Sequence, residues 1–482
     1  MKKARNAWLA VLLLATVLVL SACGTPTPSP APAPGPTPTP DGPSDPFAAC
    51  ESVAADTERA QASFGELKIR SSVQNGITES NGVYTIRKGG DYEISGMLYD
   101  GAIRVEVGKE EKVKLILMQA YISSATHAPI TLVSADELTV KAEGDTYNVL
   151  HDRRPSSAIL EADAAVYSKD DLTFSGRGVL VLRSDNGMGA HSSNDIHIKN
   201  VSLKIDAYDT ALKGNDSVTV ESGTLCLISR AEDGIKTSNT DLSSKGKQRG
   251  SVTVQGGRVD VFSAGDGIQA AFSYLQMDGT VTVRTGRYAT YPHTVNGTFS
   301  DATASKGIKC EHELTVKDGT LWVMAEEAAL KANGGTVTES GMTGKGTVHL
   351  SGGYVFAGSG DFAVCADGNF TVSSAYFVME ALSDEGLTDV HGTVTYMTSN
   401  VLFLGHADAF PTEAVSLDHL SMSADTYTVL NGESTPFVFT AHTAHTSLGL
   451  LCASPLPDGT YTVKSKSDTV CTFQIVNGIH AE

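Results

Sequence analysis

The chain has no surplus of positive charge. Its 482 residues include 36 lysines and arginines against 55 aspartates and glutamates, which gives a net charge of -19. Because nucleic-acid binding requires clustered Lys and Arg to neutralise phosphate, this balance argues against a nucleic-acid-binding protein. Clustered acidic residues instead suit hard cations such as calcium, which prefer oxygen ligands.

Helical periodicity and the common catalytic patterns are also missing. No repeat unit shows a helix-length period of 3.6, and there is no G-x-S-x-G, H-E-x-x-H, phosphate-loop or EF-hand sequence. His442 and His445 stand in a polar stretch, where we expect them to face solvent. The 47 glycines, with many Val, Thr and Ser, favour strands and turns.

Residues 1–22 are predicted to be a lipoprotein signal peptide. A positively charged start leads into Ala7–Leu20, an apolar run of 14 residues that is too short to span a membrane. The following Leu-Ser-Ala-Cys resembles the bacterial lipobox, which implies cleavage before Cys23 and lipid attachment to its sulfur. The alternative is an ordinary secretory cleavage site. Lipidation would place the protein on the extracellular face of a bacterial membrane.

The rest of the chain divides by composition. Residues 23–46 form a Pro/Thr-rich linker of extended polyproline type. Residues 47–82 are predicted to be an N-terminal cap, helical over Pro46–Ser63, and residues 410–482 a C-terminal cap. Cys452 and Cys471 could form a disulfide or remain two buried thiols, and the other cysteines lack metal-binding spacing.

A repeat of about 22–24 residues sets the predicted architecture of residues 83–409. Each unit holds three short strand signals with apolar residues at every second position, and three units carry insertions. The physical solution is a parallel β-helix, an all-β solenoid in which each unit is one coil. The units start at Ala165, Gly189, Ala211, Gly234, Gly267, Gly307, Ala329 and Phe362.

Residues in equivalent positions of successive coils should form rows on the solenoid. In "DGIK" Ile235 points inward, so the next residue points outward. The equivalent outward positions hold His191, Lys213, Lys236, Gln269, Lys309 and Lys331. The corner just before them holds the acids Asp185, Asp209, Glu232, Asp233, Asp266 and Asp361, with Asn239 and Asp241 in the first insertion.

These stacked acids have two interpretations. Like charges on adjacent coils repel unless a cation intervenes, and calcium held by Asp185, Asp209, Glu232, Asp233, Asn239, Asp241 and Asp266 would satisfy that need. Alternatively, Asp-Gly forms the turns and Lys pairs with the acids. A related choice concerns Lys213 and Lys236, which could serve as the base of a calcium-dependent lyase or belong to a salt-bridged surface row.

A second outward row carries aromatic side chains. Alternation places Trp322 outward, with Phe356 in the matched position, Tyr354 on the same face and Tyr376 one coil later. Such a strip stacks well against sugar rings, unless the C-terminal segment or an insertion covers it. The longest insertion offers Tyr288, Tyr291 and His293 as further sugar contacts, or is a plain exposed loop.

Several phrases resemble a known family. "AAVYSKDDLTFSGRGVLVL", "DGIKTSNTDLSSKGKQRGSVTVQGG" and "GDGIQA" are similar to the bacterial carbohydrate-binding β-helix family of cell-surface lipoproteins, with a fold like polysaccharide lyase family 9 pectate lyases. The resemblance covers about Val83–Val470. It implies a right-handed parallel β-helix, bound calcium, and binding to cellulose and pectin-type polymers without implying lyase activity. Lys306 stands where the neighbouring copy has Asp266, which questions a cation site at that coil.

The sequence therefore predicts a calcium-stabilised, surface-tethered protein that binds plant-type polysaccharides. The alternative is a calcium-dependent pectate lyase that acts by β-elimination. A third hypothesis is a structural adhesin with a protein partner.

Overall fold

The structure is a computed structural model that describes residues 64–289, 304–334, 345–383, 386–466 and 468–481. The predicted helix at Pro46–Ser63, Cys23, Tyr291 and His293 lie outside these residues. Within the described ranges the helical elements are three single 3-10 turns, η2 (Ser156–Ala158), η3 (Gly286–Tyr288) and η4 (Ala407–Ala409). No helix of the described part is long and apolar enough to cross a membrane.

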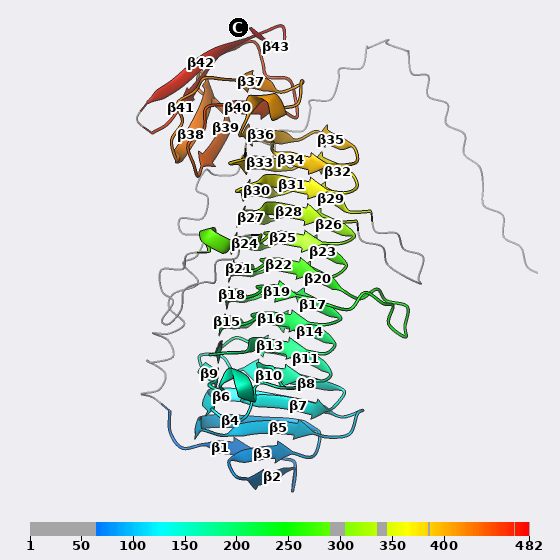
Figure 1. The fold of residues 1–482 in the computed structure, drawn as a ribbon. Helices are drawn as coiled ribbons and strands as arrows, with labels where there is room; N and C mark the ends of the chain where they lie inside the picture. Colours follow the sequence, from blue (N-terminus) through cyan, green and yellow to red (C-terminus); the bar gives the residue numbers. More distant parts are fainter. Residues whose placement is uncertain (1–63, 290–303, 335–344, 384–385, 467, 482) are drawn as a thin grey trace, which may run out of the picture. The chain divides into compact units, whose positions relative to one another are not determined.

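Three columns of parallel strands stack coil upon coil (Figure 1). Sheet 1 has 13 strands, which pair in parallel except that the first is antiparallel to the second. They are β2 (Ile77–Ser80), β3 (Val83–Ile86), β5 (Ala102–Glu106), β7 (Ile130–Ser134), β10 (Ala164–Ser168), β13 (Met188–Ser192), β16 (Leu212–Gly214), β19 (Ile235–Lys236), β22 (Ile268–Ala270), β25 (Ile308–Cys310), β28 (Ala328–Ala332), β31 (Phe362–Ala366) and β34 (Thr388–Val390).

Sheet 2 follows sheet 1 in each coil. Its strands are β8 (Glu137–Ala142), β11 (Asp171–Gly176), β14 (Asp195–Lys199), β17 (Ser217–Val220), β20 (Ser251–Val254), β23 (Ser273–Gln276), β26 (Glu313–Val316), β29 (Thr347–Leu350), β32 (Phe370–Ser373) and β35 (Val394–Met397).

Sheet 3 completes the coil. Its strands are β9 (Tyr147–Asp152), β12 (Val179–Ser184), β15 (Ser202–Ala207), β18 (Thr224–Ser229), β21 (Arg258–Ser263), β24 (Thr280–Thr285), β27 (Thr320–Ala325), β30 (Tyr354–Ser359), β33 (Tyr376–Ala381) and β36 (Asn400–Leu404). The long strands β4 (Gly90–Tyr99) and β6 (Lys112–Ser124) join sheets 2 and 3, and β1 (Lys68–Arg70) pairs antiparallel with β4.

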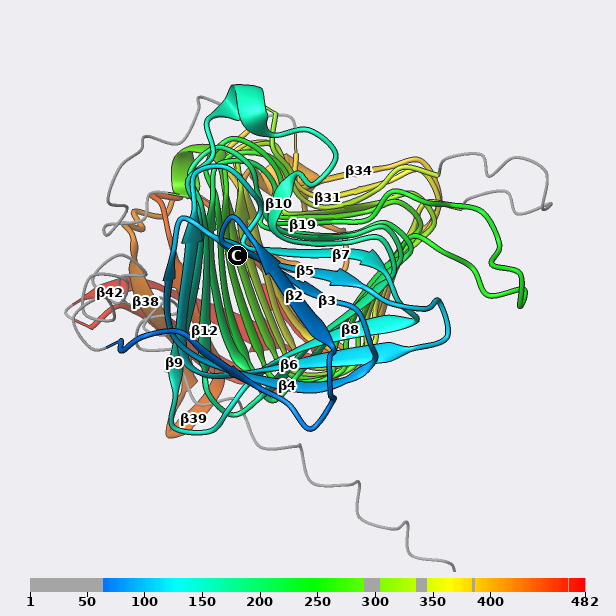
Figure 2. The ribbon, with the colours of Figure 1, turned by 90° about the horizontal axis from the view of Figure 1, so that it is seen from below.

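Alternation along each strand fills the core between the three sheets. In β14, Ile196 and Ile198 are fully buried whereas Asp195 and His197 are half-buried on the outer face. Figure 2 looks along the stack and shows the coils superposed, with β12, β8 and β19 on three sides. This arrangement confirms the predicted all-β solenoid of parallel strands, and its right-handed sense stays a prediction.

Glycine is required where successive coils meet closely. Gly257, Gly279 and Gly319 follow sheet 2 in three successive coils, each with φ between 83° and 89°, in the left-handed region that favours glycine. Gly267 needs its bare Cα for space, because a Cβ there would lie 2.1 Å from Val283 Cγ1. The repeated glycines of the sequence are therefore the sites where coils stack.

The residues after the coils form antiparallel strands; we call this part the cap, and its role as a cover stays a prediction. Strand β40 (Leu448–Leu451) runs antiparallel to both β36 and β37 (Val415–Leu417). A separate five-stranded sheet contains β38 (Asp425–Asn431), β39 (Ser434–Ala441), β41 (Gly459–Lys464), β42 (Thr469–Val476) and β43 (Ile479–Ala481). Cys452 and Cys471 are free thiols at the edge of this cap's core, so they do not form the disulfide that the sequence left open.

Candidate functional site

The outward row of sheet 1 is aligned as the sequence predicted. Strand pairing places His191 beside Lys213, Lys213 beside Lys236, and Lys236 beside Gln269. Lys309 and Lys331 continue the row in the next coils. We call these six residues the lysine row.

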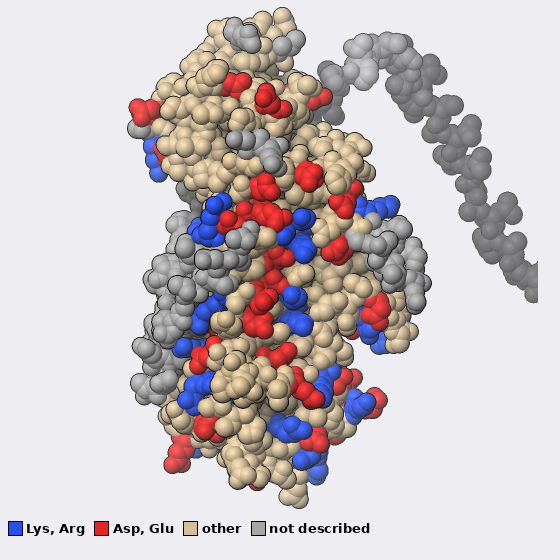
Figure 3. All heavy atoms as spheres, in the orientation of Figure 1, with Lys and Arg blue, Asp and Glu red and all other residues tan. Residues whose placement is uncertain are grey.

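The acids lie at the corner that precedes the lysine row. Asp233 and Asp266 each stand two residues before the buried isoleucine of their strand, and Lys306 takes this position one coil later. Figure 3 shows the result as a column of acidic side chains flanked by basic ones on this face. We call Asp209, Glu232, Asp233, Asp266 and Glu327 the acid row.

The carboxylates of the acid row connect one coil to the next. Asp233 Oδ1 accepts the backbone N–H of Asp266 at 2.9 Å, and Asp266 Oδ1 accepts that of Lys306 at 2.8 Å. The second oxygen of Asp233 lies 2.7 Å from Lys236 Nζ. These acids therefore stabilise the stacked corners through hydrogen bonds, and the lysines balance their charge.

Lys306 replaces an acid without breaking the pattern. Its Nζ lies 2.8 Å from Glu327 Oε2, and Lys331 Nζ lies 3.4 Å from the other carboxylate oxygen. Burial alone would raise the pKa of Glu327, but the hydrogen bond and charge of Lys306 hold that pKa below its usual value. Lys306, which stands where the preceding coil has Asp266, therefore pairs with an acid of the following coil.

The electrostatics around Lys236 favour its protonated form. Burial alone would lower the pKa of Lys236, but the hydrogen bond to Asp233 and the surrounding carboxylates raise it above its usual value. Burial raises the pKa of Asp266, and burial together with the charge of Asp233 raises that of Glu232. Lys236 is therefore held in its protonated form as a hydrogen-bond donor to Asp233, which does not suit a general base.

The predicted metal ligands do not come together as one set. Asp185 belongs to another group, 3.0 Å from His151 Nε2 and 3.3 Å from Arg183 Nε. In the insertion after β19, Asn239 donates to Asp216 at 2.5 Å and Asp241 lies 2.8 Å from Arg249 Nη1. Asp209 accepts the backbone N–H of the following residue at 2.5 Å. Separate cations and amides hold these oxygens, and the calcium site stays a prediction.

The described acids offer calcium no ready set of ligands. Among the described residues, no group of three or more His, Cys, Asp and Glu side chains could hold a metal ion. Lysine and backbone N–H groups occupy the space between the stacked carboxylates instead. The acids as arranged do not fit a preformed calcium site, and calcium binding stays a prediction for experiment.

The aromatic strip is real but covered. Trp322 stacks on Phe356 and Tyr354 on Tyr376, with ring centroids 5.2 and 5.6 Å apart, in the predicted register. Trp322 is 8% exposed and Phe356 1%, because both lie in the core cluster that includes the cap strands. Tyr376 Oη donates to Val438 O at 2.8 Å. The strip is thus cap-binding surface, which corrects its assignment as an open sugar-stacking face.

Tyr288 lies at the edge of the same buried cluster. It ends the turn η3 and packs partly buried against the cluster, and the guanidinium of Arg287 lies 5.0 Å from its ring centroid. Its predicted companions Tyr291 and His293 are outside the described residues.

The sequence missed a buried carboxylate beneath the cap. Glu380 on β33 accepts hydrogen bonds from the backbone N–H groups of His442 and Thr443 and lies 2.8 Å from His445 Nε2. His445 is buried and His442 half-buried, so the prediction that they face solvent is wrong. The one sign of this contact in the sequence is that Glu380 points outward on the same strand as Tyr376 of the aromatic strip.

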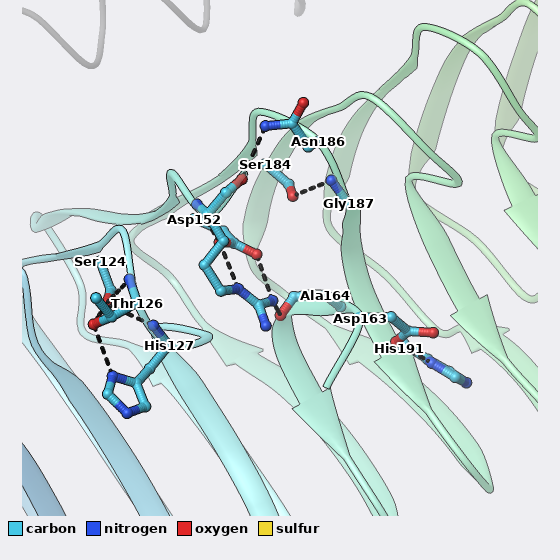
Figure 4. Close-up of polar contacts among 11 residues, drawn as sticks. Ser124, Thr126, His127, Asp152, Asp163, Ala164, Ser184, Asn186, Gly187 and His191 are labelled. Atoms are coloured by element: carbon cyan, nitrogen blue, oxygen red, sulfur yellow. Dashed lines mark hydrogen bonds and ion pairs between the residues drawn. The ribbon is translucent and has the colours of Figure 1, made fainter. Parts of the chain in front are cut away.

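Two further polar pairs were not predicted (Figure 4). His191 Nδ1 lies 2.6 Å from Asp163 Oδ1, so the first member of the lysine row has its own acid. Asp152 and Arg154 form a buried, bidentate ion pair where the chain leaves β9. Arg154 Nε donates to Asp152 Oδ1 at 2.9 Å, and Arg154 Nη2 donates to Asp152 Oδ2 at 2.7 Å. Both pairs satisfy charges at coil corners, as the acid row does.

Comparison with known proteins points to carbohydrate binding. A family model described as "Carbohydrate-binding domain-containing protein" matches residues 80–348. A curated protein with that description from Acetivibrio thermocellus is 30% identical over 148 residues, which are 30% of this chain and 52% of the relative. The chain therefore spans about half the length of the curated relative it matches.

One solved structure is also similar. It is described as a polysaccharide lyase-like protein from C. thermocellum, in a gadolinium derivative. The two chains are 29% identical, and the match covers 52% of this chain and 93% of the other with a TM-score of 0.45.

Proposed function

The chain belongs to the family of carbohydrate-binding domain-containing proteins, and from this premise we propose that it binds polysaccharides without cleaving them. The observation that carries the proposal is the continuous row of ammonium, amide and carboxylate groups on the outer face of sheet 1. Coils repeat every ~4.8 Å, so these donors and acceptors follow a line along which a polymer of hydroxyl-bearing sugars can hydrogen-bond.

The raised pKa of Lys236 supports binding over cleavage. A lyase needs a deprotonated base, and the pKa of Lys236 is raised by its ion pair with Asp233 despite the opposing effect of burial. No observation in the described residues favours the lyase over the binding protein.

We propose cellulose and pectin-type polygalacturonate as the polymers. Pectate is anionic and would approach against the chain's net charge of -19. Binding of pectate would lean on calcium recruited from solution, whereas an uncharged polymer needs no such bridge. Chelation should therefore weaken retention on pectate more than retention on cellulose, and equal loss on both would contradict this division.

One experiment separates the candidate functions. The protein is incubated with polygalacturonate and with cellulose, with and without calcium, and both retention and the absorbance of unsaturated sugar product are measured. We expect retention without product. Product would establish the lyase, and retention on neither polymer would favour the adhesin.

A matched pair of variants tests the lysine row itself. Lys236→Met removes a charge from the row, and Lys245→Met removes one from an exposed position in the insertion. We expect only Lys236→Met to reduce retention on pectate. Equal retention in both variants would remove the row from the proposal.

We further propose that lipid on Cys23 holds the protein at the extracellular face of a bacterial membrane. The lipobox resemblance and the proline-rich linker support this location. Cys23→Ser should move the protein from the membrane fraction to the medium, and an unchanged distribution would count against the anchor.

A further inference from the structure

The outer face of sheet 3 is buried well beyond the strands that share a core with the cap. Strand pairing aligns one outward position through five successive coils, from β6 to β18. Its members are Tyr121, Val149, Val181, Lys204 and Cys226. Their chain neighbours, such as Leu225 and Leu227, fill the solenoid core, so alternation directs these side chains outward. The members other than Lys204 are nevertheless at most 2% exposed.

A segment outside the coils has to cover this row. Among the described residues, only Phe64 and Ala289 join the buried cluster of this row from outside the strands. Phe64 packs on Tyr121 with ring centroids 5.6 Å apart, but it lies four coils from Cys226. Ala289 adds a single methyl group. These contacts are too few to cover the row, so another part of the chain is needed.

The sulfur of Cys226 identifies that part. Cys226 is disulfide-bonded, and the sequence has seven cysteines. The free thiols are those of Cys310, Cys365, Cys452 and Cys471. The partner of Cys226 is therefore Cys23 or Cys50. Cys23 is the predicted site of lipid attachment, which leaves Cys50.

The length of chain between Cys50 and Phe64 fits the distance that it would span. Tyr121, which contacts Phe64, and Cys226 are four coils apart, or about 19 Å at ~4.8 Å per coil. Phe64 follows Cys50 by 14 residues, and an α-helix of that length rises about 21 Å. The sequence predicts a helix over these residues, with Cys50 and Ala54 on one face.

We propose that residues 47–63 dock as a helix along the outer face of sheet 3, fixed there by a disulfide between Cys50 and Cys226. The two thiols lose two protons and two electrons as the bond forms. A disulfide-bearing oxidant of the extracellular space takes these up and becomes a dithiol. Such bonds persist outside the cytoplasm, where the predicted signal peptide would send the chain. The proposal does not depend on the carbohydrate-binding function.

The docked segment would give the faces of the solenoid different roles. Residues 47–63 would cover the side of the coils instead of their end, and they would close this part of sheet 3 to a polymer. Sheet 1 would keep its charged rows on the surface. The predicted linker ends four residues before Cys50, so a pull on the linker would reach the solenoid at β18 rather than at its first strand.

Peptide mapping of the secreted protein, isolated without reductant, tests the bond. Cleavage at acidic residues separates Cys50 from Cys23 and releases Cys226 within residues 222–232. Mass spectrometry should find the Cys50 peptide joined to this one. A free Cys50 thiol, or another partner for Cys226, would overturn the proposal.

Reduction tests whether the bond holds the segment in place. Reductant should lower the melting temperature of the wild type on the order of 5 °C and leave that of Cys50→Ala unchanged. Cys365→Ala removes a buried free thiol, so it is the matched control and should respond to reductant as the wild type does. An equal response of Cys50→Ala and the wild type would contradict the bond.

A second pair of cysteines tests the docked helix. Lys204 stands one coil before Cys226, and Ala54 would stand one helical turn after Cys50. Ala54→Cys combined with Lys204→Cys should form an additional disulfide. Ser52→Cys, on the opposite face of the helix, should not form one with Lys204→Cys. Equal yields would refute the docked helix, and the cover of the row would then fall to residues 290–303.

Discussion

The carboxylate of Asp233 accepts the backbone N–H of Asp266, its counterpart one coil later, at 2.9 Å. Asp266 repeats the contact with the N–H of Lys306 at 2.8 Å. An acid that would be repelled by its neighbour's charge is thus held by its neighbour's backbone, with Lys236 alongside. The acidic repeat is therefore explained by coil stacking, whatever it binds in addition.

The effect of calcium should depend on Lys236. The sequence predicts that calcium raises the melting temperature of the protein. In Lys236→Met, Asp233 loses the ammonium group that pairs with it. Calcium can then take the place of that cation, so we expect a larger rise in melting temperature for this variant. Thermal unfolding with calcium and after chelation measures both, with Lys245→Met as the control. Identical curves for all three proteins under both conditions would reject a calcium site in the acid row.

Acid should loosen the cap through Glu380. Burial alone would raise the pKa of this carboxyl, but hydrogen bonds from His442 and His445 lower it from 4.5 to about 2. A lowered pKa contributes stability that is fully present above pH 4.5 and lost as the pH falls towards 2. The loss should be on the order of 3 kcal/mol.

Cap release can be followed by the fluorescence of Trp322, one of only two tryptophans in the sequence, the other being Trp8 in the predicted signal peptide. Glu380→Gln should already be destabilised at pH 7 and should show a flatter pH dependence between 4.5 and 2. A wild-type cap that stays equally stable throughout this interval would contradict the assignment.

The aromatic strip should contribute to stability rather than to sugar binding. Phe356→Ala leaves a cavity under the cap and should cost about 3–5 kcal/mol, because the side chain is fully buried. Tyr99→Ala, at a tyrosine that is 66% exposed, is the control and should change little. Denaturant unfolding measures both, and weaker retention on cellulose by a fully folded Phe356→Ala protein would restore the sugar-stacking role.

The corner glycine should tolerate no side chain. In Gly267→Ala the new Cβ would meet Val283 Cγ1 at 2.1 Å and Gly307 O at 2.5 Å, so the coils must separate or shift. We expect a loss of about 1–3 kcal/mol in the free energy of unfolding. Gly65→Ala, which meets nothing within 4 Å, is the matched control. Equal stability of the two variants would show that the corner yields without cost.

The repeat allowed much of the fold to be predicted. Period-two alternation and the 22–24-residue unit determined which residues face inward, so the lysine row and the pairing of Trp322 with Phe356 were correct. Each coil must stay in register with its neighbours. An error of one residue in the predicted alternation would have placed apolar residues on the outer face.

What lies outside the repeat could not be predicted. The burial of Trp322 depends on where the cap packs, and no periodic pattern in the cap encodes that contact. The separation of Asp185 from Asp233 follows from a corner geometry that sequence spacing does not report. His445 was misassigned for the same reason, because its acid lies 65 positions away.

Strand β40 blocks extension of the stack at one end of sheet 3. It pairs with β36, the last coil strand of sheet 3, in the antiparallel sense. A parallel solenoid grows by adding a strand of the same direction to its exposed edge, and here a reversed strand occupies that edge. In sheet 3, this end therefore cannot template another molecule's coil, and end-to-end polymerisation through that edge would require β40 to leave first.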